Sequence, residues 1–325
     1  MAQKWGESFL KSGLPLEHLT LVTFKTLGWE CEPRYEYQRR GQLTYFEIDL
    51  IAYSPSDERG DLLFLVECKY HDEQRFWFFL PCSTVDHQAQ YEAMSAGENL
   101  ESDEHVVHFA PYSPLADPDK ESLLTLAPKT TWGVTVSRSG AKEQNSIQEA
   151  LDQLAYGFVP FCLDRLYNFC ASYPKAVIPM IVTTAKLFCL RPQIYDVDGI
   201  RKANSPSDIA DELSWTWCYY APRGELQDYN MDEINEWKRE HPVWQTNWHT
   251  IHPLKAFPPV ESQLIDLWSF PHWVVVANIE GLHDATQAIY SQFLQLPMDF
   301  SLNEQLGTAI ETATARKRDG RSEDH

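Results

Sequence analysis

Two apolar segments with charged residues inside them constrain the fold of this chain more than any other feature. Residues 45–53 read YFEIDLIAY and residues 62–70 read LLFLVECKY, with a polar turn between them. The second segment begins with five consecutive apolar residues, which is typical of a central strand covered on both faces. The two segments therefore predict neighbouring strands in one sheet.

The charged residues of these two strands are expected to lie close together. Asp49 lies in the first strand, and Glu67 and Lys69 lie in the second. Side chains two residues apart share a face of a strand, so Glu67 and Lys69 point the same way and Cys68 points into the opposite layer. The pattern predicts that two carboxylates and one amine meet at one end of the sheet.

Two carboxylates at one place repel each other unless a cation lies between them. Hard oxygen ligands favour Mg²⁺ or Mn²⁺, and the backbone carbonyl of Cys68 is a candidate further ligand. Lys69 beside such an ion would orient or deprotonate a water, or stabilise an anionic transition state, as metal-assisted phosphodiester hydrolysis requires. The alternative is a salt-bridged cluster without metal, which would leave a net charge at low dielectric and is costly.

The rest of the chain predicts an α/β or α+β arrangement around one mixed sheet. Apolar residues at helical spacing over 15–27 precede a strand-like segment at 29–38, and a long helical pattern covers residues 146–173. Residues 175–190 predict either two abutting strands or one strand that bends near Pro179.

Composition divides the chain into parts. Residues 73–141 are rich in acid, proline and serine, and we expect them to form an insertion packed on a core. Residues 196–300 are polar and rich in tryptophan, with one predicted strand and one predicted helix. The expected parts are a core of residues 1–72 and 142–195, an insertion of residues 73–141, a C-terminal extension of residues 196–300 and a flexible tail of residues 301–325.

Charge and composition limit the classes of function. The chain carries 47 acidic and 27 basic residues, which gives a formal net charge of −20. Such a field disfavours polyanions and anionic membranes unless a local basic groove or metal ions intervene. The seven cysteines form no CxxC pair, so we expect free thiols. No apolar run reaches the ~18 residues of a membrane span and no apolar signal segment is present, so we expect a soluble, cytoplasmic protein.

The charged strands and the helix before them resemble the PD-(D/E)xK nuclease superfamily, which has the restriction-endonuclease-like fold. The matching segments are FEID with Asp49, VECK with Glu67 and Lys69, and PLEHLTLVTFKTLGWEC with Glu17. The likeness is greatest to the methyl-directed restriction branch. It covers residues 14–70 well and residues 146–190 more loosely, and Ile48 stands where the motif has proline.

The resemblance implies a mixed β-sheet flanked by helices and a Mg²⁺- or Mn²⁺-dependent endonuclease acting on DNA, in restriction or defence. The site that it implies has Asp49, Glu67 and the Cys68 carbonyl as metal ligands, Lys69 for the water, Glu17 to support the metal site, and Gln153, or else Gln148, to position it. A homodimer or a protein partner that delivers the DNA fits such an activity. The alternative function is a non-catalytic interaction protein that keeps the nuclease-like fold and binds a partner through its acidic insertion.

Other residues could join a site but also have simpler structural interpretations. Glu7 and Glu47 could support a metal or be solvated carboxylates. Four basic residues could contact phosphates or be surface charges: Arg39, Arg40, Arg138 and Lys142. Two histidine pairs could bind zinc or be ordinary histidines: His105 with His108, and His249 with His252. Five tryptophans could form a platform for base stacking or an aromatic core: Trp215, Trp217, Trp237, Trp244 and Trp248.

Overall fold

The structure of the chain is a computed structural model. It describes residues 2–39, 42–55, 61–72, 74–82, 94–99, 104–109, 123–138, 145–168, 174–194, 196–220, 224–240 and 273–295. Within these residues, no helix is long and apolar enough to cross a membrane.

One large sheet organises the described residues. The described residues of this sheet form 12 strands. Ten of them run in the order β1-β2-β3-β8-β12-β11-β7-β4-β9-β10, and β5 and β6 form a hairpin that pairs with β8 through β5. The strands are β1 (Glu30–Gln38), β2 (Tyr45–Tyr53), β3 (Asp61–Lys69), β4 (Arg75–Pro81), β5 (Met94–Asn99), β6 (Glu104–Phe109), β7 (Lys129–Ser137), β8 (Pro174–Thr183), β9 (Lys186–Leu190), β10 (Ala210–Leu213), β11 (Trp215–Tyr219) and β12 (Trp273–Asn278).

The sheet is mixed, as the sequence predicted. The pairs β3–β8, β8–β12, β11–β7 and β4–β9 are parallel, whereas β1–β2, β2–β3 and β11–β12 are antiparallel. Strand β3 has a parallel partner on one side and an antiparallel partner on the other, and its residues 62–68 are all buried. The apolar run of this strand is therefore explained by burial on both faces.

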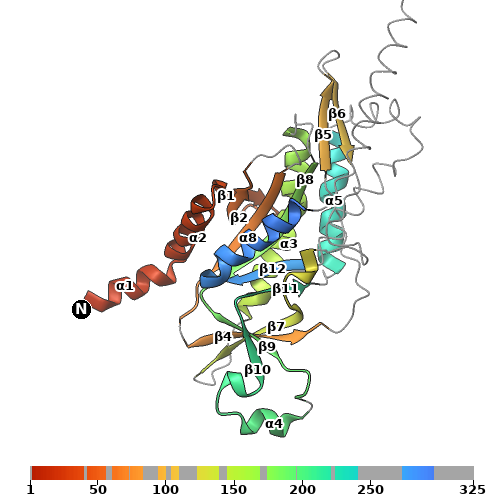
Figure 1. The fold of residues 1–325 in the computed structure, drawn as a ribbon. Helices are drawn as coiled ribbons and strands as arrows, with labels where there is room; N and C mark the ends of the chain where they lie inside the picture. The colour runs from red at the N-terminus through yellow and green to blue at the C-terminus, as the bar shows by residue number, and fades with distance from the viewer. Residues whose placement is uncertain are drawn as a thin grey trace, which may run out of the picture.

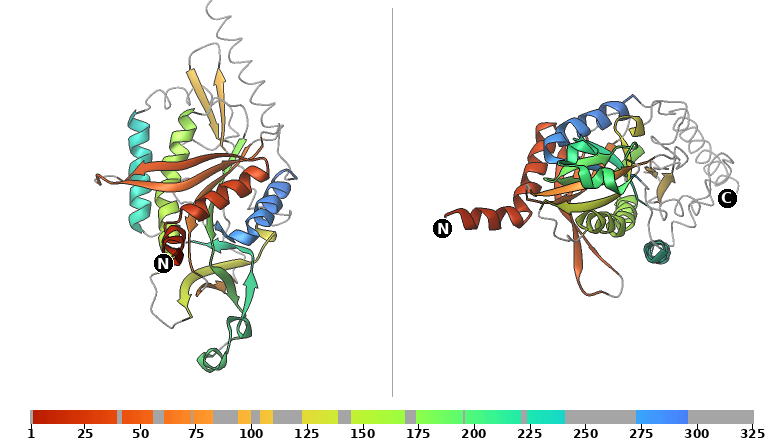
Figure 2. Two further views of the ribbon diagram at one scale, coloured as in Figure 1. Left: turned by 90° about the vertical axis from the view of Figure 1, so that its left-hand side faces the viewer. Right: turned by 90° about the horizontal axis from the view of Figure 1, so that it is seen from below.

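Helices cover both faces of the sheet. The described helices of four residues or more are α1 (Ala2–Lys11), α2 (Leu14–Thr26), α3 (Ser146–Asn168), α4 (Val197–Lys202), α5 (Gly224–Glu240) and α8 (Leu282–Phe293). Helices α2 and α8 lie on one face, and α3 lies on the other with α5 packed beside it (Figures 1 and 2). Helix α1 projects away from the sheet beyond α2 (Figure 1).

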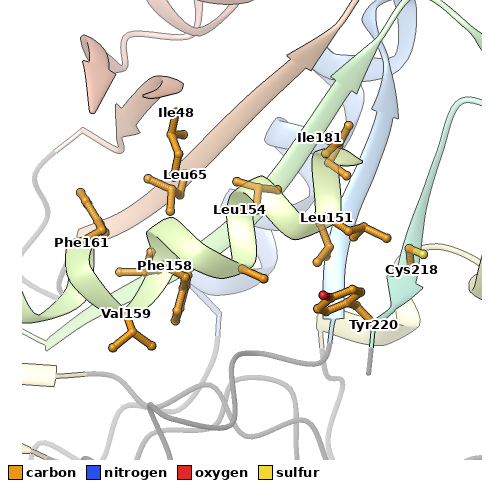
Figure 3. Close-up of a cluster of buried hydrophobic side chains, with 14 of the residues drawn as sticks. Ile48, Leu65, Leu151, Leu154, Phe158, Val159, Phe161, Ile181, Cys218 and Tyr220 are labelled. Carbon is orange, nitrogen blue, oxygen red and sulfur yellow. The ribbon is translucent and has the colours of Figure 1, made fainter. Parts of the chain in front are cut away.

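Each face of the sheet has its own hydrophobic core. The core beneath α3 contains Ile48, Leu65 and Ile181 from three neighbouring strands, packed against Leu154 and Phe158 of the helix (Figure 3). The core beneath α2 and α8 contains the alternate strand residues, among them Leu50, Val66 and Val182. This alternation is the period of two that a sheet covered on both faces requires.

The predicted elements of the first part of the chain are confirmed within a residue or two. The predicted helix at 15–27 is α2, and the predicted strands at 45–53 and 62–70 are β2 and β3. Residues 175–190 form the two abutting strands β8 and β9, with the break at residues 184–185 and Pro179 inside β8. Strand β12 first pairs with β8 at Met180, so Pro179 is not paired to that neighbour.

The later segments contribute more to the sheet than the sequence indicated. The expected insertion supplies β4 and β7, which lie within the sheet between β11 and β9. Residues 196–300 supply β10, β11 and β12 where one strand was predicted, and β12 lies between β8 and β11. Contacts with strands distant in the sequence, rather than local pattern, set the place of these strands in the sheet. The predicted tail at 301–325 lies outside the described residues.

Candidate active site

Asp49 lies where strands β2 and β3 separate. The paired register of these strands runs from Tyr53–Leu63 to Leu50–Val66, one residue short of Asp49. Beyond that point the Oδ2 atom of Asp49 accepts a hydrogen bond from the backbone N–H of Cys68 at 2.6 Å. The carboxylate therefore satisfies a strand amide that the β2 backbone no longer pairs with.

The alternation of side chains between the two faces of the sheet is interrupted in strand β2 at Asp49. Leu50 packs in the core beneath α2 and α8, whereas Ile48, two residues earlier, packs in the core beneath α3. A regular strand would send both side chains to one face. In the paired strand β1, the residue level with Asp49 is Arg34, which has a left-handed φ of 60°. The local twist of both strands thus places Asp49 at the junction between the two faces.

Glu67 and Lys69 point together toward α3. The Nζ atom of Lys69 lies 2.7 Å from Oε1 of Glu67 and donates to Oε1 of Gln153 at 2.5 Å. Cys68, between them, packs on the opposite side, where its Sγ lies 3.6 Å from the Thr20 hydroxyl of α2. The predicted orientations of these three strand residues are confirmed.

Glu67 is the most deeply buried charged group of this cluster. Its side chain is 2% exposed, whereas the side chain of Lys69 is 21% exposed. One carboxylate oxygen, Oε1, pairs with Lys69, but the other, Oε2, is buried without a hydrogen-bond partner. A buried carboxylate oxygen that lacks a partner is costly, so this atom marks where a further cation or donor would be accommodated.

The electrostatics of the site disfavour two charged carboxylates. Burial and the neighbouring charge of Asp49 raise the pKa of Glu67 to about 8, although the charge and hydrogen bond of Lys69 lower it. Burial and the charge of Glu17 also raise the pKa of Asp49 to about 6, although the hydrogen bond from Cys68 lowers it. Without a cation beside it, Glu67 therefore keeps a proton at neutral pH.

These residues fit a hard divalent cation. Asp49 and Glu67 offer carboxylate oxygens, and Oε2 of Glu67 has no competing partner. Among the described residues, no group of three or more His, Cys, Asp or Glu side chains is arranged to hold a metal. Mg²⁺ does not require such a group, because it usually keeps several waters and binds through one or two carboxylates. The donor set agrees better with Mg²⁺ or Mn²⁺ than with zinc.

Glu17 lies near this site on the α2 side of the sheet. It is three residues before Thr20, the residue that contacts Cys68, so the two side chains share one face of the helix. Its charge raises the pKa values of both Asp49 and Glu67. The structure thus brings Glu17 within electrostatic reach of the two carboxylates.

The alternative candidates are placed elsewhere. Gln148 donates to Asp152 at 2.8 Å, so Gln153 is the glutamine that reaches Lys69. Glu7 is exposed on α1, and Glu47 is exposed and lies 3.7 Å from Arg34. The guanidinium of Arg138 lies over the Phe76 ring.

The three candidate tryptophans that lie in the described residues are core residues. Trp215, Trp217 and Trp237 are buried, which supports aromatic packing over a platform for bases. Six cysteines of the described residues are free, as predicted. The candidates outside the described residues are Arg40, Lys142, His249, His252, Trp244, Trp248 and Cys170, together with the side chains of His105 and His108.

Sequence reasoning missed two groups of residues around the site. The Tyr37 hydroxyl donates to the backbone carbonyl of Gln153 at 3.1 Å, which ties β1 to α3. His71 follows β3, is buried, and has Nε2 2.9 Å from the Ser146 hydroxyl at the start of α3. Neither residue has a local sequence signal, because each partner lies more than 70 residues away in the chain.

Comparison with known proteins places the chain in no family, because no protein-family model, curated protein or solved structure matches it. The mixed sheet flanked by helices is established, and the restriction-endonuclease-like fold remains a prediction. What the site does is inferred below from its own geometry and chemistry.

Proposed function

We propose that this protein is a Mg²⁺-dependent phosphodiesterase that cleaves DNA as an endonuclease, on a restriction-endonuclease-like core. The observation that carries the proposal is the pair of carboxylates from adjacent strands, Glu67 buried and Asp49 half-buried, with Oε2 of Glu67 unpartnered and Lys69 beside it. The resemblance to the methyl-directed restriction branch makes restriction or defence the setting in which we expect the activity.

Asp49 and Glu67 would hold the metal. The Cys68 carbonyl is a third candidate ligand, because the N–H and C=O groups of one strand residue point to the same side and the Cys68 N–H points to Asp49. A bound Mg²⁺ would neutralise the two carboxylates, activate a water and stabilise charge on the scissile phosphate. Glu17 adds negative charge on the α2 side and so favours cation binding further.

Lys69 supplies the positive charge of the protein itself. Its ammonium is held between Glu67 and Gln153, with its side chain 21% exposed. An ammonium fixed in this way at the edge of the carboxylate pair orients a water through its N–H donors and stabilises the anionic transition state. Gln153 limits the number of positions that the flexible lysine side chain occupies.

The test is metal-dependent cleavage of a panel of plasmid, methylated, linear and single-stranded DNA. Each substrate is incubated with Mg²⁺, Mn²⁺ or EDTA and with the wild type, Asp49→Asn and Lys69→Met proteins. We expect cleavage only with metal, and we expect both variants to lose it. Calorimetric titration with Mn²⁺ should show binding that Asp49→Asn weakens.

A second ion pair in the chain provides matched controls. Lys186 and Glu212 lie 2.8 Å apart on the surface, joined across β9 and β10, with their side chains 56% and 49% exposed. Lys186→Met and Glu212→Gln change charge in the same way as the site variants, and both should retain wild-type cleavage. A wild type that cleaves no substrate and binds no Mn²⁺ would contradict the proposal and favour the non-catalytic interaction protein.

A further inference from the structure

A second cationic group lies beside the candidate active site, at the end of β1. The guanidinium of Arg39 lies over the ring of Phe46, 4.0 Å from its centroid, and over the ring of Tyr156, 3.9 Å from its centroid. Phe46 belongs to β2 and Tyr156 to α3, so Arg39 joins the same two elements that carry Asp49 and Gln153. Stacking on aromatic rings is a contact that guanidinium makes well and ammonium does not reproduce.

The charge of Arg39 is not balanced by an ion pair within the described residues. No carboxylate of the described residues forms an ion pair with it, although the chain has 47 acidic and 27 basic residues. Its Nε atom is buried without a hydrogen-bond partner. A half-buried guanidinium with an unsatisfied Nε and no carboxylate of the described residues beside it is a favourable place for an anion supplied from outside.

Hydrogen bonds connect Arg39 to the candidate active site. A hydrogen bond from Arg39 lowers the pKa of the Tyr37 hydroxyl against the rise that burial causes. Tyr37 in turn donates to the carbonyl of Gln153, whose side chain holds Lys69. Through Tyr37 and Gln153, Arg39 is therefore linked to Lys69 across β1, α3 and β3.

The spacing fits a nucleic-acid backbone. Phe46 precedes Asp49 by three residues, which is about 10 Å along a strand. A nucleic-acid strand carries one phosphate per about 3.4 Å of helix axis, so this separation corresponds to about three nucleotides. A guanidinium with its donors at the edge of a fixed plane suits phosphate oxygens, which it can bind in a bidentate manner.

We infer that Arg39 is a phosphate-binding residue that holds the DNA backbone a few nucleotides from the cleaved bond. This inference rests on the proposed function and gives a chain with net charge −20 one local positive contact for a polyanion. Arg39 is a binding residue and takes no part in the bond cleavage. Phe46 and Tyr156 position it.

The experiment is fluorescence anisotropy with short fluorescein-labelled DNA, single-stranded and duplex, in EDTA across a series of KCl concentrations. We expect Arg39→Gln to weaken binding about tenfold at low salt and to lower the slope of log K against log salt by about 1. Arg39→Lys keeps the charge but loses the planar group that stacks on the rings. Its affinity for DNA should therefore lie between those of the wild type and Arg39→Gln. With Mg²⁺, Arg39→Gln should raise KM and leave kcat near the wild-type value.

The controls separate folding and function. Arg201→Gln removes an arginine that is paired with Asp198 at 3.1 Å on the surface of α4, and it should bind DNA as the wild type does. Circular dichroism and thermal unfolding establish that each variant is folded. If Arg39→Gln does not fold, Arg39→Lys is used in its place for the binding measurements. Lys69→Met should lose cleavage while it keeps DNA binding.

Each outcome decides between the two proposals. If Arg39→Gln keeps wild-type affinity and salt slope, or loses kcat with KM unchanged, the inference is overturned while the nuclease assignment stands. If the wild type binds DNA through Arg39 but cleaves nothing with metal, the phosphate site stands and the nuclease assignment falls. A wild type that binds no DNA overturns both.

Discussion

The carboxylate of Asp49 accepts a hydrogen bond from the backbone amide of Cys68 at 2.6 Å, just past the last paired residues of β2 and β3. This contact gives Asp49 two separate roles. Its oxygen satisfies a strand amide, whereas its negative charge is disfavoured by burial, which raises its pKa to about 6. Substitutions can separate the two roles because Asn keeps an acceptor oxygen and Ala does not.

We expect Asp49→Asn to unfold at a urea concentration equal to or above that of the wild type, at pH 8 in EDTA. The variant keeps the acceptor for Cys68 and removes a charge that the folded state disfavours. Asp49→Ala should be less stable than Asp49→Asn by about 1–3 kcal/mol, because it leaves a strand amide unpaired. Equal midpoints for the two variants would show that the hydrogen bond does not contribute to stability.

The raised pKa values of the site carboxylates predict a stability that falls as pH rises. Glu67 has a pKa of about 8, against an ordinary value of 4.5. Between these values the folded chain binds more protons than the unfolded chain, so the free energy of unfolding decreases with increasing pH. In EDTA, the wild type should therefore lose thermal stability from pH 5 to pH 8, and Glu67→Gln should lose less.

A divalent cation should oppose this loss, since it favours the charged carboxylates. The rise in melting temperature on adding Mn²⁺ should be larger at pH 8 than at pH 5, and it should disappear in Glu67→Gln. Glu212→Gln, which changes an exposed partner of Lys186, should keep both the pH dependence and the Mn²⁺ effect. A Mn²⁺ effect of equal size in Glu67→Gln would exclude Glu67 as a ligand.

His71 should act on stability with the opposite sign. Burial lowers its pKa to about 4, from an ordinary value of 6.5. Between these values the unfolded chain binds more protons, so the free energy of unfolding decreases as pH falls from 6.5 toward 4. His71→Gln should remove this part of the acid sensitivity, which urea unfolding at several pH values would measure. If the free energy of unfolding of His71→Gln depended on pH between 4 and 6.5 as that of the wild type does, His71 would not be a buried neutral histidine.

Gly157 on α3 permits the close approach of the helix to β1 and β2. A Cβ atom at this position would meet Cδ1 of Ile48 and lie 2.9 Å from Cε1 of Tyr37. We expect Gly157→Ala to destabilise the fold by about 1–3 kcal/mol, despite the better helix propensity of alanine. Because Gln153 is one turn earlier, the variant should also reduce cleavage.

The control for this substitution is Gly6→Ala in α1, where a Cβ would have no atom within 4 Å. It should leave stability unchanged or slightly raised, since it gains helix propensity without a clash. Chemical unfolding of both variants measures the difference. If Gly157→Ala were as stable as Gly6→Ala, the helix could move away from the strands without cost.

The local pattern of the chain was sufficient for the centre of the site. Five apolar residues before Glu67 indicated a strand covered on both faces, and the period of two put Glu67 and Lys69 on one side with Cys68 on the other. Asp49 could be assigned to the neighbouring strand because a short polar turn joins two apolar segments. These inferences succeeded because they depend on interactions between residues that are close in sequence.

Partners from distant parts of the chain could not be assigned in this way. Gln148 and Gln153 lie on the same predicted helix, and only the docking of α3 on the sheet brings Gln153 to Lys69 and Gln148 to Asp152. Strand β12 illustrates the same limit, since its local sequence indicates a strand but not its place between β8 and β11. Pairing across such separations depends on packing rather than on local propensity.

The sequence by itself determined that two carboxylates and an amine would meet on neighbouring strands of a mixed sheet, because strand alternation and burial follow from short-range pattern. Only the tertiary structure decided which groups surround them. It left Oε2 of Glu67 without a hydrogen-bond partner and joined Lys69 to Gln153. It also stacked Arg39 between β2 and α3 with no carboxylate of the described residues paired to it. The physical reason is that burial, desolvation and charge pairing depend on contacts between segments far apart in the chain.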